Sequence, residues 1–473
     1  MNTENKEIRV RIAPSPTGAV HVGLVRSALY NWLFARHNHG KFVLRIEDTD
    51  VARSTQESVQ AIIEGFKWVG IDYDEGPYFQ SQRFEIYRQY TKKLIDENKA
   101  YFCYCNPDEL EAERQKAWEK KIAWKYDRRC YNLTAEQKTK YDAENKPKAL
   151  RFLIPNETVI FDDIIHGSIK KEPQDIEDFI IVRGDGTPTY NFAVVIDDAE
   201  MKINHIIRAV EHIANTPKQI LLYKALGFSL PKFAHLPLLL GTDKKKLSKR
   251  HGALSLWEYK KAGFLPEAII NFLALMGWSP GHDIEIMTLK QMIDLFSLER
   301  VNKANAVFDI NKLEWMNSIY IKNSNSEKLA NELLPLLAEI QIKPEDHKHF
   351  LRVIDLTKIR VRTLIELRDM VGAFYLKEVQ YDAENVAKYL TEQAKDYLKQ
   401  MNTRFENLAE FNTANLENEL RKLAEELGIK AAVLVHPCRV ALTGKSVGPP
   451  LFETIELLGK ETTIKRINNI VNK

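Results

Sequence analysis

Residues 9–36 constrain this chain most, because they predict a strand, a loop and a helix in direct succession. Val10 and Ile12 alternate with polar residues, which predicts the strand. The sequence APSPTG that follows contains prolines and a glycine and predicts a loop. From His21 onward, apolar residues recur at helical spacing on one face. This order favours a parallel sheet whose strands lead into covering helices.

The same alternation continues through the first hundred residues. A second strand is expected at Lys41–Ile46, and helices are expected over 56–68 and 84–98, with a loop over 70–77 between them. Strands that alternate with helices in this way are typical of a doubly wound, Rossmann-type parallel sheet.

The first turn of the helix after the APSPTG loop is a candidate phosphate site. A helix that begins at the carboxyl end of a parallel strand presents unpaired N–H groups and the positive end of its dipole. Gly23 leaves room for a ring or a phosphate, and His21 could donate to a phosphate oxygen whose charge grows during a reaction. The alternative is an ordinary polar residue and a turn glycine, because short glycine motifs are common by chance.

A basic run far downstream, KKKLSKR at Lys244–Arg250, is the second notable feature. Gly241 and Gly252 lie on either side of it, which predicts a mobile loop. Its cations suit the polyphosphate of a nucleotide, as charges that stabilise a transition state. The alternatives are a solvated surface loop and an RNA-binding patch.

Together, HVGL at 21–24 and KLSKR at 246–250 resemble the two signature sequences of class I aminoacyl-tRNA synthetases. The surrounding segments RIAPSPTG, RIEDTD, DEGPYFQSQR and PTYNFAVVIDDAEMKINHIIRAVEH resemble bacterial glutamyl-tRNA synthetases in sequence and order. The resemblance extends over essentially the whole chain. Leu24 departs from the general class signature, which has a second histidine there, but the glutamyl enzymes vary at this position.

The resemblance implies a glutamate–tRNA ligase that uses ATP, with magnesium, to form glutamyl-adenylate from L-glutamate. The glutamyl group then passes to the 3′-terminal adenosine of tRNA(Glu), and tRNA is expected to be needed for activation. Such a site positions reactants and neutralises developing charge. The residues that would stabilise this charge are His21, Lys246 and Lys249.

The same resemblance implies a glutamate pocket. A guanidinium group meets a planar carboxylate with two parallel hydrogen bonds, so arginines can distinguish glutamate from glutamine. Either Arg11 or Arg208 could take the side-chain carboxylate, and Glu47 would hold the α-ammonium group. Arg208 could instead form a structural salt bridge with Asp197 or Asp198. The implied glutamate-binding residues are Arg11, Ala13, Ser15, Glu47, Tyr190 and Arg208.

The implied ATP site combines the two signature segments with residues between them. Leu238 and Leu239 would line the adenine side, although apolar residues like these usually pack in a core. The implied ATP-binding residues are His21, Gly23, Glu211, His212, Leu238, Leu239, Lys246, Ser248 and Lys249.

Three of the four cysteines, Cys103, Cys105 and Cys130, lie close together in the sequence. Thiolates can hold a tetrahedral zinc ion, and clustered cysteines in a reduced compartment favour metal over disulfides. By resemblance, Tyr126 would be the fourth ligand, because Asn132 stands where the family has a histidine. The alternative is an insertion that has lost its metal, since tyrosine and asparagine are weak zinc ligands. A structural role follows in either case.

The middle of the chain is expected to leave the parallel sheet and return to it. Arg151–Ile169 predicts a β-rich insertion, and Phe179–Arg183 a strand that rejoins the sheet. Two further strands are expected, one leading into Asp197 and Asp198 and one over 203–210.

After Gly252 only helices are expected, first in a domain that contacts the tRNA stems and then in an anticodon-binding domain. By resemblance an all-helical C-terminal half counts against glutaminyl-tRNA synthetase, whose corresponding region is β-barrel. The predicted tRNA-binding residues are Asp50, Lys358, Arg360 and Arg362. The residues that decide between a discriminating enzyme and one that also charges tRNA(Gln) are not evident.

With 473 residues, several domains are expected. The net charge of only +3 means that any RNA must meet local basic patches. The sequence has no apolar run of about 18 residues and a polar N-terminus, so we expect a cytoplasmic protein, acting as a monomer. The expected domains are the two halves of the catalytic domain (1–100 and 179–254), an inserted α+β domain (101–178), a helical stem-contact domain (255–322) and an anticodon-binding domain (323–473).

Two other functions fit parts of the sequence. A nucleotidyltransferase that acts on a small molecule without RNA would leave the helical C-terminal half without a role. A catalytically silent tRNA-binding paralogue would be expected to lose residues such as His21, Gly23 and the KLSKR lysines, which are intact.

Overall fold

The computed structural model describes residues 7–50, 54–122, 124–247 and 255–472. The chain forms two compact units. The first contains Met1–Trp257 and Ile270–Asp309, and the second contains Glu258–Ile269 and Ile310–Lys473. Among the described residues, no helix is long and apolar enough to cross a membrane.

The first unit is built on parallel strands. β1 (Arg9–Ile12), β2 (Lys41–Ile46) and β3 (Glu75–Phe79) form one parallel sheet in that order. β9 (His205–Ala209) lies beside β1, because the N–H of Asn204 donates to the carbonyl of Arg9 at 3.1 Å. β10 (Lys232–Leu236) pairs in parallel with β9 and then with β6 of a hairpin, β6–β7. The hairpin strands and a two-stranded parallel pair are β6 (Val159–Asp163), β7 (Gly167–Lys171), β11 (Leu239–Leu240) and β12 (Ala306–Val307).

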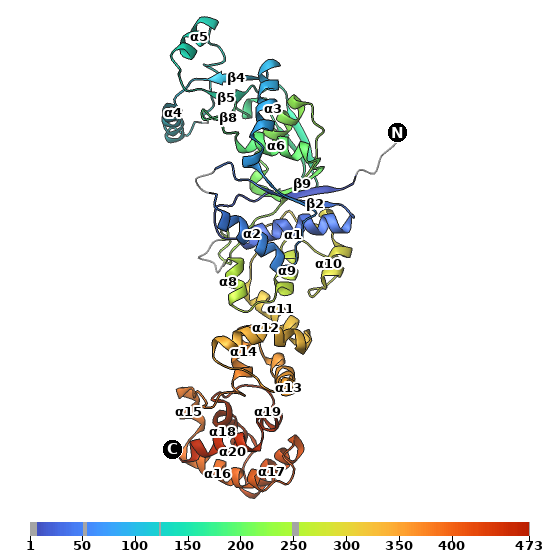
Figure 1. The fold of residues 1–473 in the computed structure, drawn as a ribbon, viewed down its shortest axis with the longest axis vertical. Coiled ribbons are helices and arrows are strands. Elements are labelled where there is room, and N and C mark those ends of the chain that lie inside the picture. The colour runs from blue at the N-terminus through green and yellow to red at the C-terminus, as the bar shows by residue number, and fades with distance from the viewer. Residues whose placement is uncertain (1–6, 51–53, 123, 248–254, 473) are drawn as a thin grey trace. The chain divides into compact units, whose positions relative to one another are not determined.

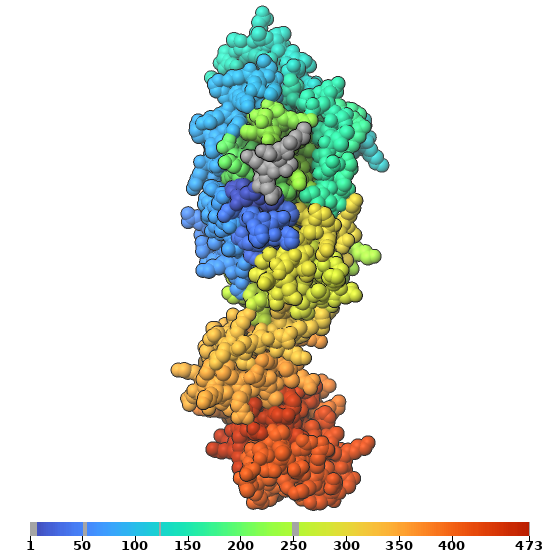
Figure 2. All heavy atoms as spheres, turned by 90° about the vertical axis from the view of Figure 1, so that its right-hand side faces the viewer, coloured from blue at the N-terminus to red at the C-terminus, as the bar shows by residue number. Residues whose placement is uncertain are grey.

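Helices cover both faces of this sheet, as a doubly wound fold requires. α1 and α2 lie on one side, and α3 and α6 lie on the other (Figure 1). α10 packs against α1, where His37 Nδ1 lies 2.8 Å from the carbonyl of Ile293, and Figure 2 shows the yellow segment against the blue one. The helices of this unit are α1 (Val22–His37), α2 (Gln56–Trp68), α3 (Phe84–Asp96), α4 (Pro107–Glu119), α5 (Ala135–Ala143), α6 (Tyr190–Glu200), α7 (Thr216–Leu226) and α10 (Leu289–Leu295), while α8 (Leu256–Lys261) and α9 (Pro266–Leu275) have residues in both units.

An antiparallel sheet is inserted between the halves of the parallel one. It contains β4 (Ala100–Cys103), β5 (Ala149–Phe152) and β8 (Ile180–Val182) in that order. The prediction that Phe179–Arg183 rejoins the parallel sheet was therefore wrong. That sheet is extended by the β6–β7 hairpin, because Asp163 at the end of β6 pairs beside Phe233 of β10.

The predicted strand leading into Asp197 and Asp198 was also wrong, because Tyr190–Glu200 is helix α6. Its residues Phe192 to Ile196 are all buried, so no polar stripe marks the helical period. The predicted loop over 70–77 also ends early, since β3 begins at Glu75.

The second unit contains helices and turns but no strand among its described residues, as predicted. The prediction that only helices follow Gly252 was wrong in one place, because the short strand β12 pairs with β11 in the first unit. Its core is formed by leucine, isoleucine and valine side chains that face inward at helical spacing. Its elements beyond residue 309 are α11 (Ile310–Asn323), α12 (Ser326–Glu339), α13 (His347–Thr357), the 3₁₀ turn η6 (Lys358–Arg360), α14 (Leu364–Gly372), α15 (Ala383–Tyr389), α16 (Glu392–Glu406), α17 (Thr413–Glu426), α18 (Ala432–Thr443), α19 (Leu451–Leu458) and α20 (Lys460–Val471).

Candidate active site

A pocket of about 780 Å³ opens at the carboxyl ends of β1, β2, β9 and β10. It lies where the strand order reverses, since the chain runs outward from β1 to β2 on one side and from β9 to β10 on the other. Ligands of open parallel sheets bind at such switch points. The predicted residues that line it are Arg11, Ala13, Ser15, His21, Gly23, Glu47, Tyr190, Arg208, Glu211, His212, Leu238, Leu239 and Lys246.

The remaining predicted residues lie elsewhere. Ser248 and Lys249 are outside the residues that the structure describes. Asp50 is not among the residues that line the pocket. Lys358, Arg360 and Arg362 belong to the second unit, and the cysteines to the inserted antiparallel sheet and the loops around it.

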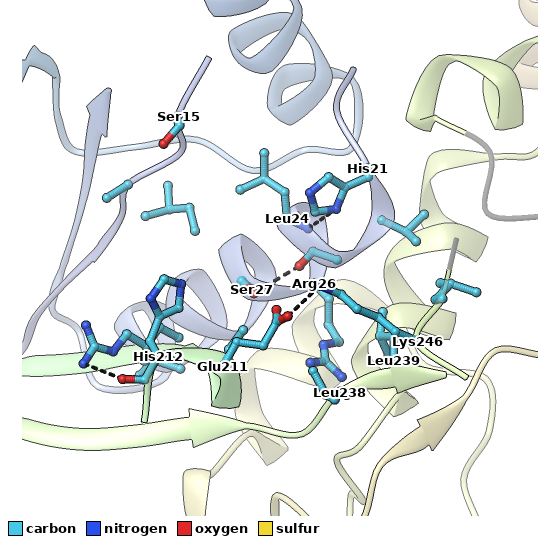
Figure 3. Close-up of a pocket in the computed structure, with 18 of the residues that line it drawn as sticks. Ser15, His21, Leu24, Arg26, Ser27, Glu211, His212, Leu238, Leu239 and Lys246 are labelled. Carbon is cyan, nitrogen blue, oxygen red and sulfur yellow. Dashed lines mark hydrogen bonds and ion pairs between the residues drawn. The ribbon is translucent and has the colours of Figure 1, made fainter. Parts of the chain in front are cut away.

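His21 caps the first turn of α1 with its own ring. Its Nδ1 accepts a hydrogen bond from the backbone N–H of Leu24 at 3.1 Å (Figure 3). Burial lowers the pKa of His21, and the nearby Lys246 cation lowers it further. Because Nδ1 accepts this hydrogen bond, the ring carries a proton on Nε2, which can act as a donor toward a ligand. A Cβ on Gly23 would lie 3.1 Å from His21 Nδ1, so glycine gives the ring room to make this cap.

Lys246 and Glu211 form an ion pair in the pocket, with Nζ 2.5 Å from Oε1 (Figure 3). Both side chains are about half exposed or more, at 67% and 48%. A pair so open to solvent stabilises the fold little, and its partners can exchange for a ligand at small cost.

Arg11 belongs to a buried ionic network. Its Nε lies 3.2 Å from Oδ1 of Asp198, which also accepts from Arg45 at 2.7 Å. Burial alone would raise the pKa of the Asp198 carboxyl, but the guanidinium groups of Arg11 and Arg45 lower it below its usual value. Asp197, the neighbouring carboxylate on α6, accepts from Arg83 at 2.7 Å.

Arg208 has quite different surroundings. Its guanidinium donates to Thr216, His235 and, more weakly, the hydroxyl of Tyr190. No ion pair to a carboxylate is found for it in the described part of the chain, so the predicted salt bridge with Asp197 or Asp198 is not formed there. Its exposed fraction is only 6%, and burial lowers its pKa. A buried cation that lines a pocket without a counter-ion is a strong anion site.

Glu47 follows the end of β2 and supplies a buried negative charge to the pocket, whereas the other pocket carboxylate, Glu211, is about half exposed. Burial raises the pKa of the Glu47 carboxyl, against the opposing effect of Arg45 and Arg11. Its only ion pair in the described residues, to Arg45, is long at 3.5 Å. The Glu47 carboxylate and the Arg208 guanidinium, which has no carboxylate partner among the described residues, therefore line the same cavity. This suits a ligand that carries both an ammonium group and a carboxylate.

The sequence analysis missed Arg26, which also lines the pocket. Arg26 is 3% exposed and donates to the carbonyls of Pro237 and Met276. It therefore ties α1 to the segment that carries Leu238 and Leu239. The sequence did contain a signal for this buried role, because Arg26 lies four positions after Val22 and therefore on the apolar face of α1.

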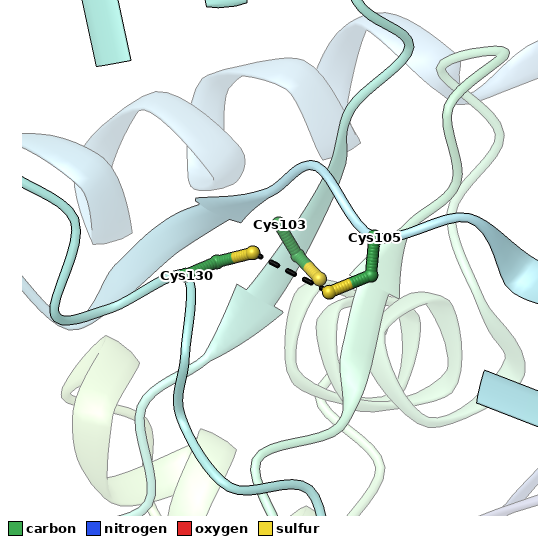
Figure 4. A group of neighbouring side chains, drawn as sticks. All are labelled: Cys103, Cys105 and Cys130. Atoms are coloured by element: carbon green, nitrogen blue, oxygen red, sulfur yellow. Dashed lines mark hydrogen bonds between the residues drawn. The ribbon is translucent and has the colours of Figure 1, made fainter. Parts of the chain in front are cut away.

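The cysteine cluster lies in the inserted antiparallel sheet and the loops around it. The Sγ atoms of Cys103, Cys105 and Cys130 all lie within 4.8 Å of one another and converge in Figure 4. Zinc–thiolate bonds of about 2.3 Å require sulfur atoms about 3.8 Å apart, so the cluster fits a zinc ion. The hydroxyl of Tyr126, which is 2% exposed, lies 3.5 and 3.6 Å from Cys103 and Cys105. Asn132 is exposed.

The predicted tRNA-binding residues of the second unit are not equivalent. Lys358 is held by Asp355 at 2.7 Å and by the carbonyl of Ser324. Arg362 pairs with Glu314 at 3.0 Å. Arg360 is exposed, and no ion pair is found for it in the described part of the chain.

The fold and the pocket define a class I aminoacyl-tRNA synthetase. Residues 7–315 match the family described as tRNA synthetases class I (E and Q), catalytic domain, and residues 328–471 match an anticodon binding domain. The chain is 46% identical to glutamate–tRNA ligase 1 of Caldanaerobacter subterraneus subsp. tengcongensis over 98% of both chains, and 46% identical to the glutamate–tRNA ligase of Geotalea uraniireducens over 98% of this chain and 97% of the other.

A solved glutamate–tRNA ligase from Elizabethkingia meningosepticum, in complex with its amino acid, superposes with a TM-score of 0.90 at 33% identity, over 99% of this chain and 100% of that one. This chain therefore belongs to the glutamate–tRNA ligase family. The family, the enzyme class and the overall fold expected from the sequence are confirmed.

Proposed function

We propose that this glutamate–tRNA ligase binds L-glutamate with Arg208 on the side-chain carboxylate and Glu47 on the α-ammonium group. Three arginines line the pocket, and the observation that carries this proposal is the contrast between Arg11 and Arg208. The third, Arg26, is already engaged by the backbone carbonyls of Pro237 and Met276. Arg11 is already neutralised by Asp198, whereas Arg208 is buried with no carboxylate partner among the described residues. A carboxylate ligand therefore gains most at Arg208, and an amide would leave that charge unpaired.

Tyr190, Ala13 and Ser15 complete the proposed glutamate side of the pocket. The Tyr190 hydroxyl lies 3.4 Å from Nη1 of Arg208 and 3.0 Å from Nδ1 of His212. It is thus held at the edge of the guanidinium group, where a bound carboxylate would also lie. Arg11 also lines the pocket, but Asp198 already pairs with its guanidinium group.

ATP is proposed to occupy the α1 end of the pocket. The phosphates would meet the first turn of α1 beside Gly23, where His21 Nε2 can donate and the helix dipole favours an anion. Lys246 would leave Glu211 for the phosphates, since its present ion pair is exposed. Leu238 and Leu239 would pack on the adenine ring, and Ser248 and Lys249 would add contacts from the KLSKR segment.

The chemistry follows from these positions. The α-carboxylate oxygen of glutamate attacks the α-phosphorus of ATP in line, and the bond to the bridging oxygen breaks, so that pyrophosphate leaves with its electron pair. His21 and Lys246 stabilise the charge that builds on the phosphate oxygens, with Lys249 assisting. The terminal adenosine hydroxyl of tRNA then attacks the activated carbonyl, and AMP leaves. Magnesium bound to the ATP phosphates would neutralise part of their negative charge.

We also propose a structural zinc ion held by Cys103, Cys105, Cys130 and Tyr126. Tyr126 is favoured over Asn132 as the fourth ligand, because its buried hydroxyl already points at two of the thiols. The ion would fix the loops of the inserted antiparallel sheet. The protein is proposed to act as a cytoplasmic monomer, with tRNA(Glu) as its RNA partner.

The test is glutamate-dependent exchange of labelled pyrophosphate into ATP, without RNA, with tRNA(Glu) and with tRNA(Gln). We expect exchange only when tRNA(Glu) is present. Exchange with both tRNAs would make the enzyme non-discriminating, and exchange without RNA would overturn the expected tRNA dependence. If folded protein shows no exchange under any condition, the catalytic proposal fails, and a catalytically silent tRNA-binding paralogue becomes the remaining interpretation.

The same assay tests the glutamate site. Arg208→Leu should raise the KM for glutamate by about a hundredfold, the cost of losing a charged hydrogen-bond pair in a buried site, while the KM for ATP changes little. An unchanged KM for glutamate would refute the role of Arg208.

A further inference from the structure

Behind Arg208, away from the substrate groups, lies a buried pair that the reaction does not use. His235 on β10 and Asp163 at the end of β6 are both fully buried in their side chains, and His235 Nδ1 lies 2.6 Å from Asp163 Oδ2. On the other side of the ring, Nε2 of His235 lies 3.1 Å from Nε of Arg208. The three side chains form a line from Asp163 through His235 to Arg208.

The direction of each hydrogen bond in this line is determined. The other oxygen of Asp163, Oδ1, accepts from the backbone N–H groups of Ile165 and His166 at 3.0 and 2.9 Å. An ionised carboxylate can only accept, so the proton between Asp163 and His235 belongs to Nδ1 of the ring. Nε2 is then an acceptor, and the Nε–H of Arg208, which can only donate, faces it. The Thr216 hydroxyl also lies 3.1 Å from Nε2 and can donate to it.

In this arrangement Nε and Nη2 of Arg208 donate to the protein, and one N–H of Nη1 remains for a ligand in the pocket. Nη2 donates to Thr216 Oγ1 at 2.8 Å, while Nη1 lies beside the Tyr190 hydroxyl at 3.4 Å. Nη2 also lies 3.5 Å from the His212 carbonyl, so the protein contacts all three nitrogens of the guanidinium group, most closely Nε and Nη2. A pre-fixed guanidinium loses little entropy when it binds a carboxylate.

The ring must also be neutral. The charged and titratable groups around it are Asp163, Arg208, His212 and His166, whose Nε2 lies 2.9 Å from the His235 carbonyl. Burial lowers the pKa of His235, against the effect of Asp163. If both nitrogens of the ring were protonated, Nε2–H would face the Nε–H of Arg208, and the His235 cation would repel the Arg208 cation beside it.

We propose that His235 and Asp163 are positioning residues for glutamate recognition, in which Asp163 fixes the histidine tautomer that orients Arg208 toward the substrate carboxylate. This inference rests on the proposed role of Arg208. It assigns glutamate affinity to two residues that do not line the pocket.

The decisive variant is Asp163→Asn, which keeps shape and volume. The backbone N–H groups of Ile165 and His166 would hold the amide oxygen, so the amide NH₂ would face His235. The ring would then move its proton to Nε2, where it opposes the Nε–H of Arg208. We expect the KM for glutamate to rise about tenfold, while the KM for ATP and kcat stay within about twofold, because only glutamate contacts Arg208.

His235→Gln and His235→Leu separate positioning from packing. Glutamine can place an amide oxygen near Nε2 and accept from Arg208, whereas leucine cannot. We expect leucine to raise the KM for glutamate at least as much as Asp163→Asn, and glutamine to restore most of the affinity. Adding Asp163→Asn to His235→Gln should then have little further effect, because no tautomer remains to be switched.

His205→Gln is the matched control, since His205 is a buried histidine on the neighbouring strand β9 that bonds to Asn204 and not to Arg208. It should leave the KM for glutamate unchanged. Equal effects of all the histidine variants, or an unchanged KM in Asp163→Asn, would overturn the proposal. If Arg208→Leu is itself without effect, the glutamate site has been placed wrongly. If Arg208→Leu is damaging and Asp163→Asn is silent, only the positioning role fails.

Discussion

At the scale of single residues, the neighbours of a side chain decide its role. Arg11 and Arg208 carry the same guanidinium group, and both are buried and line the pocket. Asp198 on α6 takes Arg11 and Arg45 as partners, and so makes Arg11 part of the scaffold. Arg208 is left to neutral partners, and so remains available for a ligand.

Replacing Asp198 with asparagine tests this division. Its folded-state pKa lies below the ordinary value, so ionised Asp198 stabilises the fold above about pH 4, and this contribution is lost as the pH falls through the folded pKa. We expect Asp198→Asn to lower the free energy of unfolding by about 3–5 kcal/mol at pH 7, because it removes the carboxylate that pairs with Arg11 and the nearest carboxylate partner of Arg45. The difference from the wild type should shrink as the pH is lowered below about 4. Urea unfolding at several pH values measures this.

Glu85→Gln is the control for that experiment. Glu85 pairs with Arg88 on the surface, where both side chains are about 70% exposed. Its removal should change stability by less than about 1 kcal/mol at any pH. Equal losses in the two variants would contradict a special role for the buried network.

At the scale of elements, helical spacing of apolar residues was enough to predict α1 and α2. α2 has one buried face, whereas α1 is buried on most sides and was still predicted, because polar residues interrupt its apolar run. α6 was taken for a strand because Val194, Val195 and Ile196 are buried together and favour strands locally, while packing on all sides decides for a helix. β3 was hidden by Gly76 and Pro77, which an edge strand tolerates.

The site shows the same limit. Resemblance named thirteen residues that line the pocket, but not that Asp198 neutralises Arg11. That pairing depends on which way α6 faces, which no local pattern in the sequence reveals. Arg26 and His235 were missed for a similar reason, because their importance comes from partners that are distant in sequence: Pro237 and Met276 for Arg26, and Asp163 for His235.

The inserted antiparallel sheet offers a test at this scale. We expect purified protein to contain about one zinc ion per chain, and its removal by a chelator to lower the melting temperature, because a structural zinc contributes folding free energy. Tyr126→Phe should weaken zinc retention during competition with a chelator, whereas Asn132→Ala should not. Zinc content by atomic emission is the measurement. Protein without zinc, with an unchanged melting temperature after zinc is added, would show that the cysteines no longer bind metal.

At the scale of the whole molecule, the two units divide the work between chemistry and RNA. The pocket belongs entirely to the first unit. The second unit matches an anticodon binding domain over residues 328–471, and its core is independent of the parallel sheet. With a net charge of +3, the chain has no general attraction for RNA, so tRNA affinity must depend on cations that are not already paired within the protein.

Among the three predicted tRNA-binding cations of the second unit, Arg360 is the one for which the described part of the chain shows no ion pair, and Lys358 is its internal comparison. Arg360→Ala should raise the KM for tRNA several-fold and reduce the dependence of binding on salt by about one phosphate contact, because a free cation on the surface displaces one counterion. Stability and the KM for glutamate should not change. Lys358→Ala removes contacts to Asp355 and Ser324, so it should lower the melting temperature more than it weakens tRNA binding. Filter binding of tRNA(Glu) at several salt concentrations, together with thermal melting, measures both. If Lys358→Ala weakens tRNA binding more than Arg360→Ala does, Lys358 and not Arg360 contacts the RNA. The absence of an ion pair within the protein would then fail to predict which cations of this unit bind tRNA.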